Sequence, residues 1–190
     1  MSKKKPRKAE IVGKQIYLRQ LEQSDLQELT SLNRRSKRLH RGFVSPPTRP
    51  DQFNATLERS RRGESCCLVI CHLDDDAIVG SINLNQIYRG PFQSAYLGYY
   101  VGAEFAGRGF ISEAVQLTLR YAFEKLRLHR LEANIQPTNR KSIAIVRDAD
   151  FVREGFSKRY LKICGRWRDH ERWAIIAEDW RAKRKRRMPG

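Results

Sequence analysis

The residues of this 190-residue chain that are best suited to chemistry lie in one turn, AGRGFIS, at positions 106–112. Gly107 and Gly109 flank Arg108, and a helix-forming segment begins at Phe110. A helix start carries backbone N–H groups without carbonyl partners, at the positive end of the helix dipole. Glycine can take φ > 0 and lets phosphate oxygens approach these groups closely. The turn therefore predicts a cradle for the pyrophosphate of an anionic cofactor.

Two common phosphate-binding motifs do not fit this turn. A Walker loop would continue with Gly-Lys-Ser/Thr, and a dinucleotide fingerprint would have a third glycine at the helix start. Ile111 and Ser112 stand there instead. A Gly-x-Gly turn is weak evidence alone, so the neighbouring sequence has to decide which phosphate-bearing cofactor it serves.

The turn resembles motif A of the GCN5-related N-acetyltransferases (GNAT), where Gln/Arg-x-x-Gly-x-Gly/Ala holds the pyrophosphate of coenzyme A. Ala106 replaces the Gln/Arg of that pattern, and Ile111 replaces a small residue. Residues 78–114, 128–142 and 151–170 resemble the RimJ-type ribosomal-protein alanine N-acetyltransferases, in which a bulky residue at the place of Ile111 is ordinary. The resemblance runs from about residue 16 to residue 180 and implies acetyl-CoA as cosubstrate.

The resemblance also implies how the cofactor is held. The strand that carries Tyr99, Tyr100 and Val101 would splay from the next strand, and pantetheine would bond to its main chain like an added strand. A backbone N–H there would stabilise the tetrahedral oxyanion. The implied cofactor-binding residues are Tyr99, Tyr100, Val101, Ala106, Gly107, Arg108, Gly109, Phe110, Ile111, Ser112, Asn134, Asn139 and Ser142. Asn139 also suits a helix N-cap, and both roles can coexist.

Acetyl transfer needs an unprotonated amine. An α-amino group, with a pKa of about 7.7–8.0, is already partly neutral near pH 7, so a modest base acting through water suffices. Glu132 is the candidate base, and the alternative is an ion pair with Arg130 or Arg147. Tyr160 is the candidate acid for the departing thiolate, in a segment where Trp167, Asp169 and His170 also match the family pattern.

The formal net charge of +17 is concentrated at the two ends of the chain. Residues 3–8 supply five positive charges and residues 181–187 supply six, so +6 remains for the rest. The composition predicts disordered basic tails at residues 1–10 and 181–190, and the resemblance implies one acetyltransferase domain at 11–180. Such tails are typical of proteins that contact RNA through counterion release. Together with the resemblance to ribosomal-protein acetyltransferases, they predict a ribosome or rRNA contact.

Other features narrow the setting of the protein. No apolar run approaches the roughly 20 residues of a membrane span, and no apolar segment follows the basic start MSKKKPRKAE, so no membrane partner is expected. Cys66, Cys67, Cys71 and Cys164 lack the spacing of a zinc site, so reduced thiols, no metal and a cytoplasmic location are expected. Composition does not determine the oligomeric state.

The elements that position these residues alternate along the chain and predict an α/β fold. In the GNAT form, this is a mixed central sheet of about seven strands, splayed at its middle and flanked by about four helices. The expected strands are 16–18, 65–72, 77–85, 94–101, 130–135, 151–163 and 166–177. The expected helices are 24–33, opened by a capping box of Ser24 and Gln27, 50–62, 110–126 and 139–148.

Three functions remain open at this point. The preferred one is acetylation of the N-terminal α-amino group of a ribosomal or other protein, by direct attack in a ternary complex. The second is acetylation of a small amine such as an amino acid or antibiotic; a surface this basic disfavours polycations. The third is a ribosome- or RNA-associated factor whose acetyltransferase site is degenerate, with Ala106 as its support.

Overall fold

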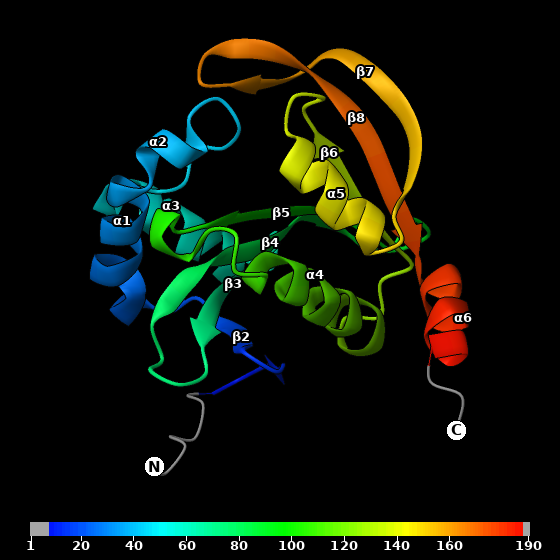
Figure 1. Cartoon of the computed structure of the whole chain (residues 1–190), viewed down its shortest axis with the longest axis horizontal. Coiled ribbons are helices and arrows are strands. Elements are labelled where there is room, and N and C mark those ends of the chain that lie inside the picture. The colour runs from blue at the N-terminus through cyan, green and yellow to red at the C-terminus, as the bar shows by residue number, and fades with distance from the viewer. Residues whose placement is uncertain (1–7, 188–190) are drawn as a thin grey trace.

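A computed structural model describes residues 8–187 and shows one mixed eight-stranded sheet (Figure 1). The strand order is β1-β2-β3-β4-β5-β6-β8-β7, and only β5 and β6 pair in parallel. The strands are β1 (Ile11–Val12), β2 (Ile16–Gln20), β3 (Ser65–His72), β4 (Ile78–Tyr88), β5 (Ser94–Val101), β6 (Arg130–Ile135), β7 (Val152–Ile163) and β8 (Arg166–Ile176). The α/β class and the GNAT-type sheet are thereby confirmed.

Helices cover both faces of the sheet. They are α1 (Leu26–Arg35), α2 (Lys37–His40), α3 (Pro50–Arg61), α4 (Phe110–Arg120), α5 (Arg140–Asp148) and α6 (Ala177–Arg187). Leu29 of α1 and Phe53 of α3 pack in one core cluster, whereas Val115 of α4 and Val146 of α5 pack in the other. The sheet is therefore the middle layer of three.

Strand β3 shows how the sequence assigns side chains to the two cores. Cys66 and Leu68 point into the cluster that contains α4, while Cys67 and Val69 point into the cluster that contains α1 and α3. This confirms that neighbouring cysteines face opposite sides, as the period of two requires. All four cysteines are free, and burial raises the pKa of Cys71 to about 11.

The start of α1 is fixed by a buried ion pair. The Arg19 guanidinium donates to both carboxylate oxygens of Asp25, at 2.8 and 2.7 Å. The same carboxylate accepts the N–H of Glu22 at 2.8 Å and so closes the turn before the helix. The expected capping box of Ser24 and Gln27 is wrong, because Glu22 and Asp25 form the capping box two residues earlier.

The sheet has one strand more than expected, and the described residues form six helices rather than four. The additions are short or charged elements that tertiary contacts hold: the two-residue β1, the single-turn α2, and α6. The prediction of a disordered tail from residue 181 is wrong for residues 181–187, because α6 extends through them. Residues 1–7 and 188–190 of the two expected tails lie outside the described residues.

The predicted helix 110–126 is confirmed as α4, but its last turn has π-helical geometry at Tyr121–Lys125.

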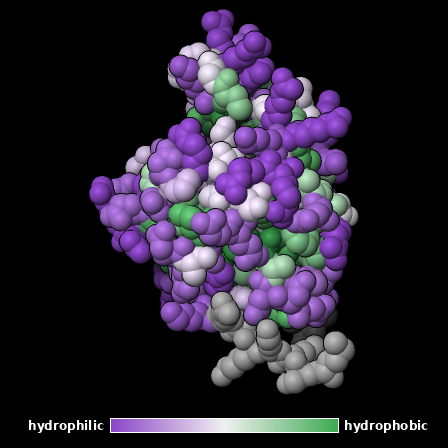
Figure 2. Space-filling view, turned by 90° about the vertical axis from the view of Figure 1, so that its left-hand side faces the viewer, coloured by the Kyte–Doolittle hydropathy of each residue, from purple (hydrophilic) through white to green (hydrophobic). Residues whose placement is uncertain are grey.

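On the face that carries α1 and α2, Figure 2 shows a mostly hydrophilic surface with apolar residues in small, separate patches. Within residues 8–187, no helix is both long and apolar enough to cross a bilayer.

Candidate active site

The sheet forks between β5 and β6. Their parallel pairing covers only Ser94 to Tyr96 against Arg130 to Glu132. On its other edge, β5 stays paired with β4 as far as Val101. The last part of β5 therefore has a free edge facing β6, and the predicted splay is confirmed.

The peptide groups at the end of β5 point into this fork. Gly102 N–H donates to the carbonyl of Val79 at 2.8 Å, which makes Gly80 and Val101 a non-hydrogen-bonded pair. In such a pair, the N–H and C=O of each residue point away from the partner strand. Val101, and by alternation Tyr99, thus present main-chain groups to the fork, as an added strand would need.

The glycine turn has the conformation that the sequence predicts. Gly107 and Gly109 take φ of 79° and 81°, and a Cβ built on either would meet nothing within 4 Å. The first hydrogen bond of α4 runs from the Glu113 N–H to the Gly109 carbonyl at 3.1 Å, so the earlier N–H groups have no partner in the helix. Arg108 stays beside them, with its guanidinium 4.8 Å from the centre of the Phe110 ring. This open, positive cradle fits a pyrophosphate.

Fork and cradle open into one pocket of about 780 Å³, a volume suited to a cofactor. The predicted cofactor-binding residues that line it are Tyr99, Tyr100, Val101, Ala106, Gly107, Arg108, Gly109, Phe110, Ile111, Ser112, Asn139 and Ser142. The charged side chains among its lining residues are Arg108, Arg140, Lys141 and Asp148. The three cations outnumber the one carboxylate, which favours the phosphates of coenzyme A over a polycation.

Helix α5 is fixed at the pocket by its cap. Asn139 Oδ1 accepts the N–H of Ser142 at 3.2 Å, so the predicted N-cap role is confirmed. The hydroxyl of Tyr99 donates to the Ser142 carbonyl at 3.3 Å and joins β5 to α5. Burial raises the pKa of Tyr99 and of Tyr100 to about 12, so both are neutral hydroxyls near pH 7.

His40 is a pocket residue that the sequence did not predict. It is 5% exposed, and its Nε2 bonds the Val101 carbonyl at 2.8 Å. Since a carbonyl only accepts, Nε2 carries the proton and Nδ1 is left as an acceptor. Nδ1 is buried without a partner among the residues that the structure describes. Burial lowers the pKa of His40, so the imidazole is neutral near pH 7.

Glu132 and Asn134 lie on the other face of β6, away from Leu131 and Ala133, which pack under α4 and α5. Glu132 is 4% exposed and its carboxylate lies 3.0 Å from Arg130 and 3.7 Å from Arg172. The predicted ion pair with Arg130 is therefore confirmed. Glu132 also pairs in register with Tyr96, the last β5 residue before the fork opens.

Tyr160 and Asn134 belong to this second face as well. The Tyr160 ring lies 6.0 Å from the Arg172 guanidinium and 6.1 Å from the His170 ring. Asn134 Oδ1 is buried and has no hydrogen-bond partner within the described part of the chain. Glu132, Asn134 and Tyr160 thus gather outside the cofactor pocket, on the side of the fork opposite α4 and α5.

The comparison with known proteins decides the family. A model of the acetyltransferase (GNAT) domain matches residues 15–152. The chain belongs to the GNAT acetyltransferases. It is 34% identical over 177 residues to the probable N-acetyltransferase YjcK of Bacillus subtilis, covering 88% of this chain and 97% of YjcK. It is 37% identical over 107 residues to the ribosomal protein uS5-alanine N-acetyltransferase of Escherichia coli, covering 56% and 55% of the two chains.

Among solved structures, Mycobacterium smegmatis RimJ in complex with CoA-disulfide superposes with a TM-score of 0.80 and 27% identity, covering 86% of this GNAT chain and 83% of RimJ. The spermidine N(1)-acetyltransferase of Vibrio cholerae is 24% identical over 168 residues, 87% of this chain and 95% of that protein. This GNAT protein is an N-acetyltransferase, and acetyl-CoA is its cosubstrate.

Proposed function

We propose that the enzyme acetylates the N-terminal α-amino group of a ribosomal or other cytoplasmic protein, by direct attack within a ternary complex. The observation that carries this proposal is the charge at the fork: Glu132, the buried carboxylate there, is already neutralised by Arg130 and Arg172. A polyamine would need unpaired carboxylates, whereas a chain terminus brings one amine and its own peptide groups. The likeness to the uS5-alanine acetyltransferase supports the same choice.

Residues on one side of the fork would bind the cofactor, and residues on the other side would transfer protons. The cradle of Gly107 and Gly109 would hold the pyrophosphate, and bound acetyl-CoA supplies the thioester that the amine attacks. The Val101 N–H, which points into the fork, would donate to the oxygen that becomes negative in the tetrahedral intermediate. This donor comes from the main chain, so substitution of its side chain need not remove it.

In this proposal, proton transfer is carried out by residues on the face of the sheet opposite α4 and α5. Glu132 would accept the proton of the amine through water, and Tyr160 would return one to the thiolate. Both lie on the face opposite the cofactor pocket, and Arg172 contacts both. The modest pKa of an α-amino group makes a water-mediated route sufficient.

Acetylation of a small amine is the second candidate, and the likeness to a spermidine acetyltransferase favours it. An RNA-associated factor with a degenerate site is the third. The cradle argues against it, because both glycines keep the conformation and the open space that a pyrophosphate requires.

Two peptides test the proposal. One begins with a free alanine and contains an internal lysine; the other is the same peptide with its α-amine blocked. Mass spectrometry after incubation with acetyl-CoA should show one added acetyl group on the first peptide only, and purified ribosomal proteins should show the same modification at their N-termini. Acetylation of both peptides, or of spermidine alone, would contradict the proposal.

A further inference from the structure

The C-terminal helix α6 is a docked part of the domain. Trp180, 9% exposed, packs on Phe123 with ring centres 5.4 Å apart. Lys183 lies 3.2 Å from the Asp150 carboxylate, and Arg184 pairs with Glu124. These contacts fix the direction of the helix and therefore the positions of its remaining cations.

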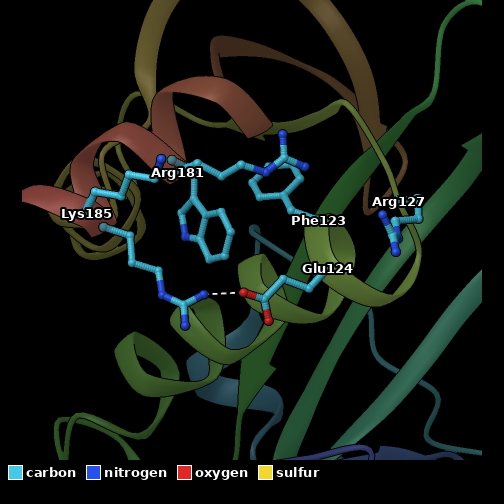
Figure 3. A pocket seen from close by; sticks show the side chains of 7 residues that line it. Phe123, Glu124, Arg127, Arg181 and Lys185 are labelled. Carbon is cyan, nitrogen blue, oxygen red and sulfur yellow. Dashed lines mark hydrogen bonds and ion pairs between the residues drawn. The ribbon is translucent and has the colours of Figure 1, made fainter. Parts of the chain in front are cut away.

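Three of the cations near α6 have no ion pair among residues 8–187: Arg127, Arg181 and Lys185. They line one pocket of about 500 Å³, with Phe123 and Trp180 in its wall (Figure 3). Arg181 and Lys185 come from α6, while Arg127 comes from the turn after the π-helical segment. Glu124, the carboxylate of this pocket, is already paired with Arg184. The pocket therefore has unneutralised positive charge from two sides.

An exposed aromatic pair lies next to this pocket. Tyr88 and Phe92 are 48% and 49% exposed, and their ring centres are 5.9 Å apart. Between them in sequence, Arg89 donates to the Leu126 carbonyl at 2.7 Å, and Leu126 directly precedes Arg127. This bond fixes the aromatic loop beside the turn that supplies one of the three cations.

Both features lie at the closed end of the sheet. Ser94 follows the aromatic loop and pairs with Arg130, and Arg130 pairs with Ile176, which directly precedes α6. The fork opens beyond Tyr96, toward the other end of β5 at Val101. The basic pocket also shares no lining residue with the acetyl-CoA pocket. A ligand bound here would leave the acetyl-transfer site free.

We propose that Arg127, Arg181 and Lys185, together with Tyr88 and Phe92, form a binding site for single-stranded RNA. The cations bind successive phosphates, and the two exposed rings stack on bases. Trp180 is covered by the Arg184 guanidinium, 5.2 Å from its ring, so the pocket binds backbone rather than bases. Phosphates and ring faces are common to all sequences, so the site has little sequence preference. This inference goes beyond the proposed acetylation and does not depend on it.

The test of the cations is fluorescence anisotropy of a labelled oligouridine with the full chain. The triple variant R127S/R181S/K185S should bind at least about tenfold more weakly, and its salt slope should fall by about 2, because a single strand contributes about 0.7 per neutralised phosphate. The matched control is K14S/R59S/K158S, which removes the same charge from exposed positions outside the pocket. It should change the affinity less than about threefold. Equal losses of oligouridine affinity in the two variants would show that RNA is attracted by net charge alone and would overturn the proposed site.

The aromatic half has its own test. Y88S/F92S should weaken oligouridine binding about tenfold while leaving the salt slope unchanged, because stacking is not ionic. Binding of heparin, a polyanion without bases, should be lost in the cation variant and kept in the aromatic variant. If Y88S/F92S binds oligouridine as the parent does, bases are not stacked there and the proposal is overturned. Acetylation of the alanine peptide should be the same in all variants, which separates this result from the fate of the proposed function.

Discussion

The imidazole of His40 donates its Nε2 proton to the carbonyl oxygen of Val101, at a distance of 2.8 Å. The two residues are 61 positions apart in sequence and meet at the end of β5, in the part of the strand that no longer pairs with β6. The bond takes up the Val101 carbonyl and leaves the N–H of the same residue facing the fork. His40 also lies edge-on to Tyr100, with ring centres 5.4 Å apart, so α2 is held against the pocket wall.

His40→Ala should therefore weaken acetyl-CoA binding, because it removes the group that orders the last residue of β5. The loss should be about tenfold, which corresponds to about 1.4 kcal/mol and to one net hydrogen bond. Titration calorimetry would measure it. His129→Ala is the control, since His129 is a surface residue that pairs with Glu178 and does not line the pocket. His40→Gln, whose amide can donate to the same carbonyl, should recover part of the affinity; no recovery would show that the ring packing matters instead.

Stability should fall as the pH is lowered through the histidine range. Burial lowers the pKa of His40 and of His170 in the folded state, whereas both have a pKa of about 6.5 when unfolded. Below about pH 6.5 the unfolded chain thus binds more protons, and the free energy of unfolding decreases with falling pH until the folded pKa values are reached. Thermal unfolding between pH 8 and about pH 5 would measure this. A double glutamine variant of the two histidines should show a flatter curve, and an equally steep one would assign the effect to other groups.

Gly109→Val should abolish acetyl-CoA binding. A Cβ at this position would point into open pocket space, where phosphate must approach the N–H groups. The φ of 81° also strains any branched residue, at a cost of about 1–3 kcal/mol. Gly63→Val is the matched control, since Gly63 has φ of 72°, equally open surroundings and no place in the pocket. Both variants should lose similar stability in denaturant titrations, and only Gly109→Val should lose the cofactor. Equal acetyl-CoA affinity in the two variants would show that the glycine turn does not bind the cofactor.

The fold was predictable where a local pattern defines an element. Ser65–His72 and Arg130–Ile135 were predicted with their observed ends, because the first is a mostly apolar run and the second alternates polar and apolar residues. The cradle was predictable for the same reason: its glycines and the helix that follows are neighbours in sequence. Asp150, with φ of 68°, likewise takes the left-handed conformation that its residue type suggests.

What was missed depends on contacts between distant residues. Charge composition suggests a disordered tail for α6, but Trp180 packs on Phe123 and Arg184 pairs with Glu124, 60 positions earlier. His40 had no local signal either, because its role comes from a carbonyl on β5. The placement of Glu132 and Tyr160 outside the cofactor pocket follows from the register of β6 and β7 on β8, which no single segment encodes.

The proposed base can be separated from its structural role by one pair of variants. Glu132→Gln should lower kcat about a hundredfold, leave acetyl-CoA affinity unchanged and remove the acid limb of the pH–rate profile, because the amide cannot accept a proton. It should also destabilise the fold by about 1–3 kcal/mol, since Arg130 and Arg172 lose a buried partner.

The matched control is Glu154→Gln. Glu154 also pairs with Arg130, but it lies at the protein surface on β7 and not at the fork. Its loss should disturb Arg130 without touching the proton path, so kcat and the pH–rate profile should match those of the parent enzyme. Rates measured well below both melting temperatures keep stability out of the comparison. If Glu132→Gln then keeps the parent profile, its carboxylate serves the ion pairs alone, and the neutral fraction of the amine together with water is sufficient for acetyl transfer.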